Sequence, residues 1–134
     1  MKFSIPVAPT AKGRPRVVRT KAGHSMTYTP DKTVDAEERI RWHLREHGAK
    51  SYPEKTPLTV SLTFWVAKPK SAKRDAQPVS RPDLDQYVKL VLDACNGILW
   101  HDDSQVVEIV ARKDYGDPCV EIDVREDDPW MEKQ

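Results

Sequence analysis

Residues Arg81–Glu108, RPDLDQYVKLVLDACNGILWHDDSQVVE, decide how the rest of the chain is interpreted. The stretch opens with two aspartates two positions apart and continues into a run whose apolar residues recur at helical spacing. An Asn-Gly pair, which is typical of a helix end, stops that run, and a short apolar segment leads to a second acidic pair. The sequence therefore gathers four carboxylates and one lysine around one predicted helix: Asp83, Asp85, Asp102, Asp103 and Lys89.

Carboxylate oxygens are hard ligands that suit Mg²⁺ or Mn²⁺, and such ions commonly serve phosphate chemistry. Asp83 and Asp85 point apart within a regular helix, so they converge on one ion only if Asp83 precedes the helix. Asp102 or Asp103 then supplies a third carboxylate from another element. Lys89, one turn beyond Asp85, is placed to bind a phosphate oxygen or to steady the attacking hydroxide.

The structural alternative makes the aspartates helix caps and loop residues, with Lys89 as the i, i+4 partner of Asp85. A D-x-D pattern alone favours that alternative. The ordered set D-x-D-x3-K, a helix and then D-D is much less common by chance, and it favours the metal site.

The predicted helix has one apolar and one polar face. Pro82 suits a helix beginning and places Asp83 at or near the N-terminal end, where free amides stabilise negative charge. Asp85, Lys89 and Asp93 recur on the polar face. The apolar face is expected to contain Leu84, Tyr87, Val88, Val91, Leu92 and Cys95, which makes Cys95 a core residue and not a nucleophile.

Outward from this stretch, alternating apolar residues predict four strands. They are Phe3–Val7, where Pro6 and Pro9 favour an edge position or an early end to the strand, Thr56–Ala67, Val106–Arg112 and Cys119–Arg125. Asp114–Pro118 is the predicted turn between the last two strands, and Val120, Ile122 and Val124 are expected to face inward.

A helix is predicted from Asp31 or Thr33 to about His47, with Gly48 as its stop. Before it, Val17-Val18 and Met26–Thr29 are the predicted arms of a hairpin. The order of elements indicates an α/β domain of the α+β kind, with one mixed sheet and two main helices. We expect one domain over residues 1–126, followed by a flexible acidic tail over residues 127–134.

Composition narrows the class of protein. A chain of 134 residues with 38% hydrophobic residues suits one domain with one core. No apolar run approaches the ~20 residues that a membrane helix needs, so no membrane association is expected. Two cysteines are too few for a disulfide scaffold, and the reducing cytoplasm is the expected location.

The net charge of +1 hides an asymmetry along the chain. Residues 1–82 contain 17 Lys and Arg against 7 Asp and Glu, whereas residues 83–134 contain 5 against 14. A basic half suits a polyanion such as DNA. The predicted DNA-binding residues are Arg14 and Arg16 in the hairpin and Lys68, Lys70, Lys73, Arg74 and Arg81 in the proline-bearing loop Lys68–Pro82. The alternatives are a solvated hairpin, a solvated connector and chance segregation of charge between halves that interleave in space.

Residues 83–108, DLDQYVKLVLDACNGILWHDDSQVVE, resemble the RusA family of Holliday junction resolvases, which has many prophage-borne members. The family pattern is D-x-D-N, a lysine four residues after the second aspartate, then D-A-L-N-G and D-D-x-Q-V. The segments GRPR and TYTP near the N-terminus resemble the phage-type branch. Gln86 replaces the usual asparagine, and Pro82 stands where some members have a basic residue.

The resemblance implies a homodimeric, Mg²⁺-dependent endonuclease of DNA recombination and repair that nicks two strands of a four-way DNA junction symmetrically. It implies metal-binding roles for Asp83, Asp85 and Asp103, with Asp103 a better match than Asp102, and a functional role for Lys89. Two readings stay open beside it: a branched-DNA-binding protein without catalysis, and a nuclease that acts on forks or flaps. Candidates for the dimer interface are Tyr87, Trp65 and Trp100, if the core does not need them.

Overall fold

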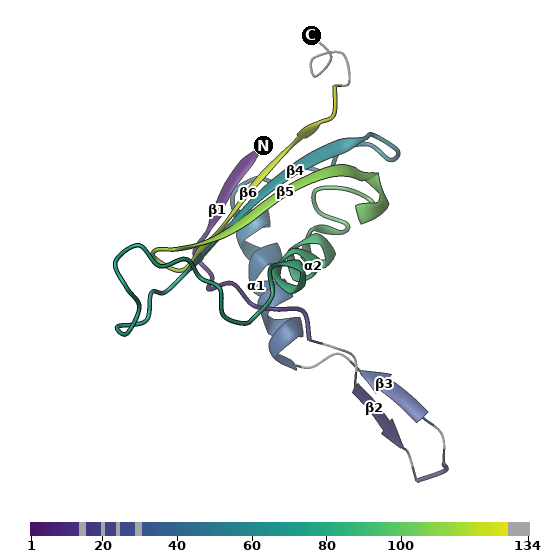
Figure 1. Cartoon of the computed structure of the whole chain (residues 1–134). Helices are drawn as coiled ribbons and strands as arrows, with labels where there is room; N and C mark the ends of the chain where they lie inside the picture. Colours follow the sequence, from purple (N-terminus) through teal and green to yellow (C-terminus); the bar gives the residue numbers. More distant parts are fainter. Residues whose placement is uncertain (14–15, 20, 24, 29–30, 129–134) are drawn as a thin grey trace.

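The chain forms one α+β domain, as the sequence predicts (Figure 1). The computed structural model describes residues 1–13, 16–19, 21–23, 25–28 and 31–128, with only the backbone described for 16–19 and 25–28. The elements are β1 (Lys2–Ile5), β2 (Arg16–Arg19), β3 (Ser25–Tyr28), α1 (Asp31–Glu46), β4 (Leu58–Val66), α2 (Leu84–Cys95), the 3-10 helix η1 (Asp103–Gln105), β5 (Val106–Tyr115) and β6 (Cys119–Glu126).

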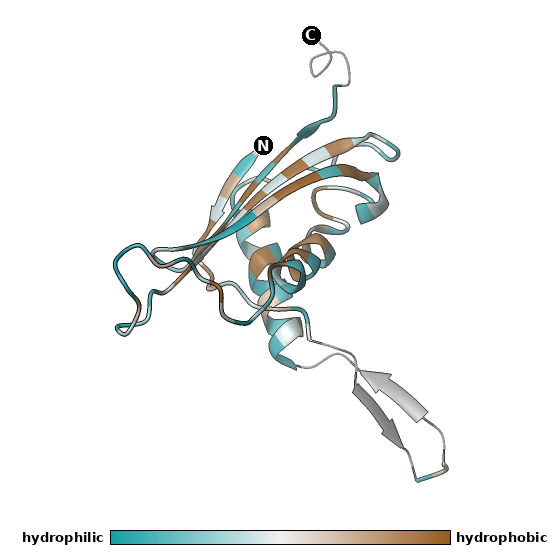
Figure 2. Cartoon of the chain, in the orientation of Figure 1, coloured by the Kyte–Doolittle hydropathy of each residue, from teal (hydrophilic) through white to brown (hydrophobic). Residues whose placement is uncertain are grey.

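Four strands form a mixed sheet in the order β1-β6-β4-β5, in which only the β4–β5 pair is parallel. The predicted edge position of β1 is confirmed. The register aligns buried side chains in rows across the sheet, namely Ile5 with Val120 and Phe64, and Phe3 with Ile122 and Leu62. Helices α1 and α2 lie on one side of the sheet, and Figure 2 shows apolar residues on these helices and on the strands. The core therefore lies between this face and the two helices.

Strand β5 extends past the predicted Arg112 to Tyr115, so Asp114 and Tyr115 of the predicted turn belong to the strand and residues 116–118 join β5 to β6. These two strands are not neighbours, because β4 lies between them. Tyr115 pairs with Val66 and Cys119 pairs with Trp65, so the connection crosses the end of β4. The backbone N–H of Gly116 donates to Val66 O at 2.9 Å. A Cβ atom on Gly116 would lie 2.6 Å from the Trp65 ring, so the crossing needs a residue without a side chain.

The buried face of α2 differs from the predicted one. Tyr87, Val91 and Cys95 are buried as predicted, but the other fully buried residues are Leu90 and Ala94. The remaining predicted core residues, Leu84, Val88 and Leu92, are half-buried at the margin of the core. The physical reason is that α2 packs against α1 as well as against the sheet, so its side toward α1 is also buried.

The segment after α2 is anchored in the core, which confirms the short apolar turn predicted there. Ile98, Leu99 and Trp100 are all buried. Trp100 Nε1 donates to Asn96 Oδ1 at 2.6 Å, and Gly97 N donates to Trp100 O at 2.7 Å. Trp100 is thus a core residue, as is Tyr87, which stacks on Phe64 with ring centroids 5.3 Å apart. Neither is available on the surface as a dimer contact.

Strands β2 and β3 pair antiparallel, which confirms the predicted hairpin, and the hairpin projects away from the domain (Figure 1). At the other end of the chain, Asp127 forms hydrogen bonds with β4 and with the segment that precedes β4. Its N–H donates to Pro57 O at 2.9 Å, and its side chain accepts from Thr59 Oγ1 at 3.1 Å. Residues 129–134 lie outside the described residues, so the predicted flexible tail stays a prediction. Among the helices described, none has the length and apolarity that a membrane span requires.

Candidate active site

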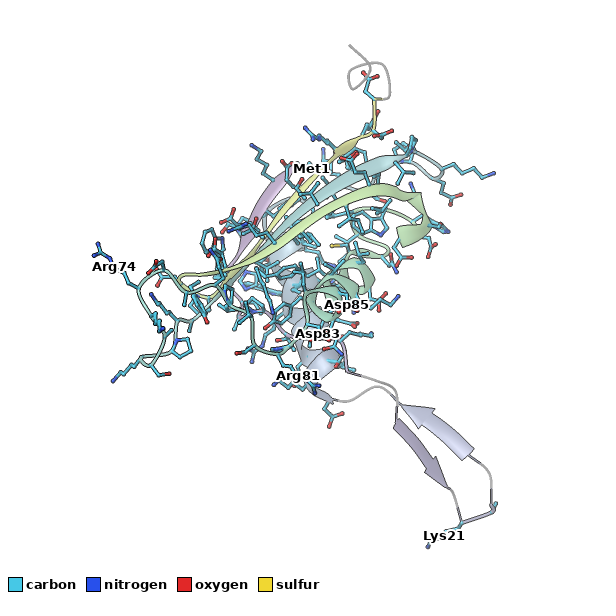
Figure 3. All side chains as sticks on the ribbon, in the orientation of Figure 1. Met1, Lys21, Arg74, Arg81, Asp83 and Asp85 are labelled. Carbon is cyan, nitrogen blue, oxygen red and sulfur yellow. The ribbon has the colours of Figure 1, made fainter. Side chains whose placement is uncertain are left out.

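Two carboxylates are exposed to solvent at the beginning of α2. Asp83 occupies the N-cap position in extended backbone geometry, with φ −71° and ψ 146°, and its side chain makes no capping hydrogen bond. Asp83 therefore precedes the helix, which is the condition for it to converge with Asp85. Both residues are exposed, and in the part of the chain that the structure describes neither carboxylate has a hydrogen-bond or ion-pair partner. Figure 3 shows Arg81, Asp83 and Asp85 following one another there.

Lys89 lies one turn beyond Asp85 but is paired elsewhere. Its Nζ is 3.2 Å from Asp93 Oδ1 and 4.0 Å from Asp103 Oδ2. The alternative in which Lys89 pairs with Asp85 is thus not the pairing found in the structure. The Lys89 side chain remains 57% exposed, so its ammonium group is accessible to a phosphate from solvent.

The two aspartates of the second acidic pair have different surroundings. Asp102 is the N-cap of η1, and its side chain accepts from the backbone N–H of Ser104 at 3.1 Å. Hydrogen bonds from Ser104 hold the pKa of Asp102 below its ordinary value. Asp103 is the one that faces Lys89, with its side chain 28% exposed. In the structure the Asp102 side chain serves as a helix cap, and the metal-binding role predicted for Asp102 stays a prediction.

A buried glutamine fixes the position of this acidic pair. Gln105 is 8% exposed, and its Oε1 accepts from the backbone N–H groups of His101 and Asp102. Its Nε2 donates to Pro53 O at 3.0 Å and to Thr56 O at 3.2 Å. The two bonds from Nε2 tie η1 to the segment before β4, and the two to Oε1 fix the backbone that leads into η1, so Gln105 helps to position Asp103. In the sequence, this glutamine is visible only as part of the D-D-x-Q-V family pattern.

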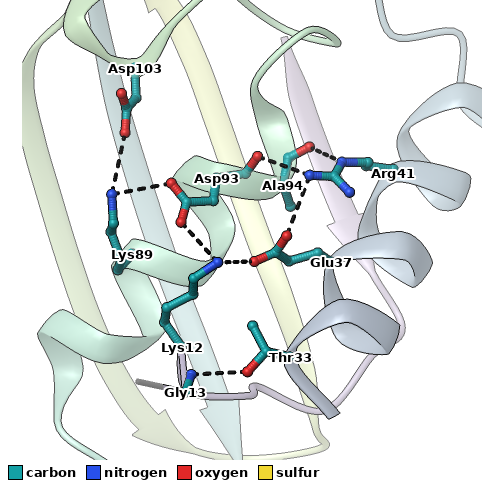
Figure 4. Close-up of polar contacts among 9 residues, drawn as sticks. All are labelled: Lys12, Gly13, Thr33, Glu37, Arg41, Lys89, Asp93, Ala94 and Asp103. Carbon is teal, nitrogen blue, oxygen red and sulfur yellow. Dashed lines mark hydrogen bonds and ion pairs between the residues drawn. The ribbon is translucent and has the colours of Figure 1, made fainter. Parts of the chain in front are cut away.

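A network of charged side chains connects α1, α2 and the segment before the hairpin (Figure 4). Lys12 Nζ lies 2.6 Å from Glu37 Oε1 and 3.1 Å from Asp93 Oδ2. Arg41 pairs with Glu37 at 3.4 Å and donates to the backbone oxygens of Asp93 and Ala94 at the end of α2. Burial alone would lower the pKa of Lys12, but the two carboxylates outweigh burial and raise it above 10.5, so Lys12 is charged at neutral pH.

Sequence reasoning missed the roles of Lys12, Glu37 and Arg41. The partners of Lys12 and the backbone oxygens that Arg41 binds lie far away along the chain, so no spacing motif reveals them. Only the i, i+4 relations of Lys89 with Asp93 and of Glu37 with Arg41 were visible in the sequence. The basic half of the chain also contacts the acidic half directly, through Lys12 and through the pairing of β1 and β4 with β6.

Two basic segments extend on either side of the open carboxylates. In Figure 3, Asp83 and Asp85 lie between Arg74, at the far end of the loop Lys68–Pro82, and Lys21 at the tip of the hairpin. Four of the predicted DNA-binding side chains in the loop are exposed: Lys70, Lys73, Arg74 and Arg81. Lys68 is exposed as well, but its Nζ donates to Arg74 O at 2.8 Å and closes the loop. The predictions for Arg14 and for the side chain of Arg16 fall outside the described residues.

The donor chemistry fits a hard divalent ion, although the carboxylates do not enclose one by themselves. Among the described residues, no group of three or more His, Cys, Asp or Glu side chains forms a metal-binding cluster. Mg²⁺ is commonly held by one or two carboxylates together with water and substrate phosphate oxygens. Asp83 and Asp85 supply two exposed carboxylates of this kind, and the metal-binding roles predicted for them and for Asp103 stay predictions.

Comparison with known proteins adds two findings. A family model described as "Endodeoxyribonuclease RusA" matches residues 6–125, a range that contains every candidate residue of the site. The chain is also similar to a protein of Bacillus subtilis (strain 168) named "Uncharacterized protein YqaN". The two are 30% identical over 139 residues, which cover 94% of this chain and 96% of the relative.

Proposed function

The chain belongs to the RusA family of endodeoxyribonucleases, and from that premise we propose that it is a Mg²⁺-dependent enzyme that resolves four-way DNA junctions by paired symmetrical nicks. The family consists of hydrolases that act on branched DNA. The observation that carries the proposal is the placement of Asp83 and Asp85. Both are exposed and unpaired among the described residues, at the start of the helix that presents Lys89.

Phosphodiester hydrolysis requires an attacking water, stabilisation of charge at phosphorus and help for the leaving oxygen. A divalent ion bound at Asp83 and Asp85 would supply part of each. Asp103 contributes a further carboxylate from η1. Lys89 is 4.0 Å from Asp103 and 57% exposed, so its ammonium group is placed to bind an oxygen of the same phosphate. Because that oxygen gains negative charge in the transition state, Lys89 stabilises it there more than in the ground state.

The basic segments give the enzyme its hold on DNA. Arg74 in the loop and Lys21 at the hairpin tip lie away from the carboxylates in different directions (Figure 3), and Lys70 and Lys73 of the same loop are also exposed. Lysine and arginine bind the phosphate backbone without sequence preference, and such binding weakens as salt concentration rises. Contacts on both sides of the carboxylates suit a branched substrate, whose arms leave the branch point in several directions. This arrangement supports a role in DNA recombination and repair.

A homodimer supplies the second nick, because a two-fold dimer presents two equivalent sites to the equivalent strands of a four-way junction. Strand β5 offers a surface for it. β5 lies at the edge of the described sheet and exposes Val107, Ile109 and Val110. An antiparallel pair of β5 strands centred on Val110 would place Glu108 of each copy opposite Arg112 of the partner subunit. Opposite charges at matched positions favour that register over its neighbours.

The direct test is cleavage of a synthetic four-way junction by the wild type and by Asp85→Asn, each with Mg²⁺ and with EDTA. Linear duplex and forked DNA serve as comparison substrates. Asp117→Asn, which alters an exposed aspartate in the β5–β6 turn, is the matched control. We expect paired nicks from the wild type and the control only with metal. Asp85→Asn should lose about a hundredfold in rate or more and keep its DNA affinity.

Other outcomes would contradict or alter the proposed function. Metal-dependent cleavage that survives Asp85→Asn would contradict the assignment of the site. Salt-sensitive binding without cleavage in Mg²⁺ or Mn²⁺ would indicate a branched-DNA-binding protein that does not cut. Faster cleavage of the fork than of the four-way junction would keep the nuclease and change its substrate.

A further inference from the structure

One carboxylate is shared by two ammonium groups. Asp93 Oδ1 lies 3.2 Å from Lys89 Nζ, and Asp93 Oδ2 lies 3.1 Å from Lys12 Nζ (Figure 4). Lys12 therefore forms an ion pair with the same carboxylate that binds Lys89. Lys12 Nζ also lies 2.6 Å from Glu37 Oε1, and the Glu37 side chain is only 10% exposed.

We infer that Lys12 and Asp93 are positioning residues for the nuclease reaction: together they fix the Lys89 ammonium group beside Asp103. The inference rests on the proposed function. It gives a role to Lys12, which no sequence pattern singles out, and to Asp93, the aspartate of the D-A-L-N-G pattern, to which the resemblance assigns no role.

Exposure along this chain of contacts supports a positioning role. The side chains of Glu37, Asp93 and Lys12 are 10%, 21% and 23% exposed, whereas that of Lys89 is 57% exposed. The contacts thus extend from the core outward to an ammonium group at the surface. A free lysine side chain samples many rotamers, and an exposed i, i+4 pair with aspartate restrains it only weakly. Because Asp93 is itself fixed by Lys12, its restraint on Lys89 is firmer than an isolated pair would provide.

Removing Lys12 has a predictable direction. Asp93 would lose one of its two cations, so Lys89 would become its sole ionic partner among the described side chains and would be drawn toward it. That movement takes the ammonium group away from Asp103 and from a phosphate bound there. Positioning losses of this kind lower the rate of the chemical step more than they lower affinity for the substrate.

Backbone hydrogen bonds of Lys12 and Gly13 also fix the segment that precedes the hairpin. The N–H of Lys12 donates to Gln86 O in the first turns of α2 at 3.0 Å, and the N–H of Gly13 donates to Thr33 Oγ1 in α1 at 2.9 Å. Lys12 therefore contacts α2 in two ways: its backbone fixes the segment that leads into β2, and its side chain binds the carboxylate that orients Lys89. The position of the DNA-binding hairpin and the position of the lysine are set together.

The test compares Lys12→Met and Lys12→Arg with Arg41→Met. Arg41 belongs to the same network and bonds Glu37 and the end of α2, but it does not contact the side-chain carboxylate of Asp93. Three quantities are measured on the full chain: the single-turnover cleavage rate of a four-way junction in Mg²⁺, the junction Kd in EDTA, and the thermal midpoint. We expect both Met variants to lower the midpoint. Only Lys12→Met should lower the cleavage rate, by about tenfold, with Kd changed less than about threefold. Lys12→Arg should restore most of the rate.

Three results would overturn the inference. An equal loss of rate in Lys12→Met and Arg41→Met would make Lys12 merely structural. A weaker Kd with an unchanged rate would make it a DNA contact. An unchanged rate in Lys12→Met, with an active wild type, would remove the inference and leave the proposed function standing. A wild type that cuts no branched DNA would instead overturn the proposed function and the inference with it.

Discussion

Lys113 Nζ donates to the carbonyl oxygen of Pro82 at 3.0 Å, so edge strand β5 holds the residue that immediately precedes Asp83. The same ammonium group donates to Ser80 O, also at 3.0 Å. The basic loop Lys68–Pro82 is therefore fixed at the end that joins the candidate active site. The backbone immediately before Asp83 is thus bound by a side chain 30 positions later than Asp83 in the sequence.

Replacing Lys113 with Met should release Ser80 and Pro82 and leave Asp83 less well oriented. We expect the cleavage rate of a four-way junction to fall by about tenfold, because small misplacements of reacting groups are costly. Lys2→Met, which removes an exposed lysine from the opposite edge strand, should leave the rate unchanged. Equal rates for both variants would show that the loop end is oriented without Lys113.

Asp102 and Asp103 are adjacent but should respond differently to substitution. Asp103→Asn removes the carboxylate that faces Lys89, and we expect about a hundredfold loss of cleavage with the thermal midpoint nearly unchanged. Asp102→Ala removes the cap of η1, and we expect a lower thermal midpoint with most of the cleavage retained. Measuring both quantities for both variants checks the assignment, and a larger loss of cleavage in Asp102→Ala would reverse it.

The proposed β5 interface predicts a charge-swap result. Glu108→Lys should place like charges opposite each other across the two-fold axis and shift the protein toward the monomer. Arg112→Glu alone should do the same. The double variant Glu108→Lys/Arg112→Glu exchanges the charges and should restore the dimer, as measured by sedimentation equilibrium over a range of protein concentrations.

The salt bridge between Arg112 and Asp114 within one chain is lost in the double variant as well, so restoration would come from the pairing between copies. A single variant that remains as dimeric as the wild type would contradict the β5 interface. So would a double variant that is no more dimeric than either single one.

Burial gives Cys95 a predictable pH dependence. It raises the pKa of the thiol from 9.0 to about 12, so the folded protein keeps the thiol protonated at a pH where the unfolded chain ionises. The buried thiol thus contributes stability below pH 9 that is lost as the pH rises toward 12. The difference in unfolding free energy between wild type and Cys95→Ala should shrink by about 1 kcal/mol per pH unit in this window.

Urea denaturation of both proteins at pH 8, 9 and 10 measures that difference, and the half-buried Cys119, present in both, contributes equally to each. A difference that stays constant across the three pH values would contradict the burial of Cys95. In the native protein at pH 8, the Cys95 thiol should also react with a thiol reagent only after unfolding.

Local patterns in the sequence determined much of this structure. The alternation of Leu58, Val60, Leu62 and Phe64 is enough to define a strand with one buried face, because the strand period is two residues. Helix α1 begins at Asp31, one of the two predicted cap residues, which is therefore its first helical residue, and it ends at Glu46, two residues before Gly48. The placement of Asp83 just before α2 followed from Pro82 and the apolar period. The family membership, confirmed by a match over residues 6–125, was indicated by the residues of the same stretch.

Only the tertiary structure decided which contacts form between distant parts of the chain. Spacing on the helix allows Lys89 to pair with Asp85 or with Asp93, and it slightly favours Asp85, which lies N-terminal to the lysine. In the folded chain Lys89 pairs with Asp93, which Lys12 also holds, and stands beside Asp103 on η1. In the same way, only the insertion of β4 between β5 and β6 shows that the glycine turn is a crossing and not a hairpin. Periodicity reports the forces within one element, whereas these choices depend on charges and packing surfaces that folding brings together from separate elements.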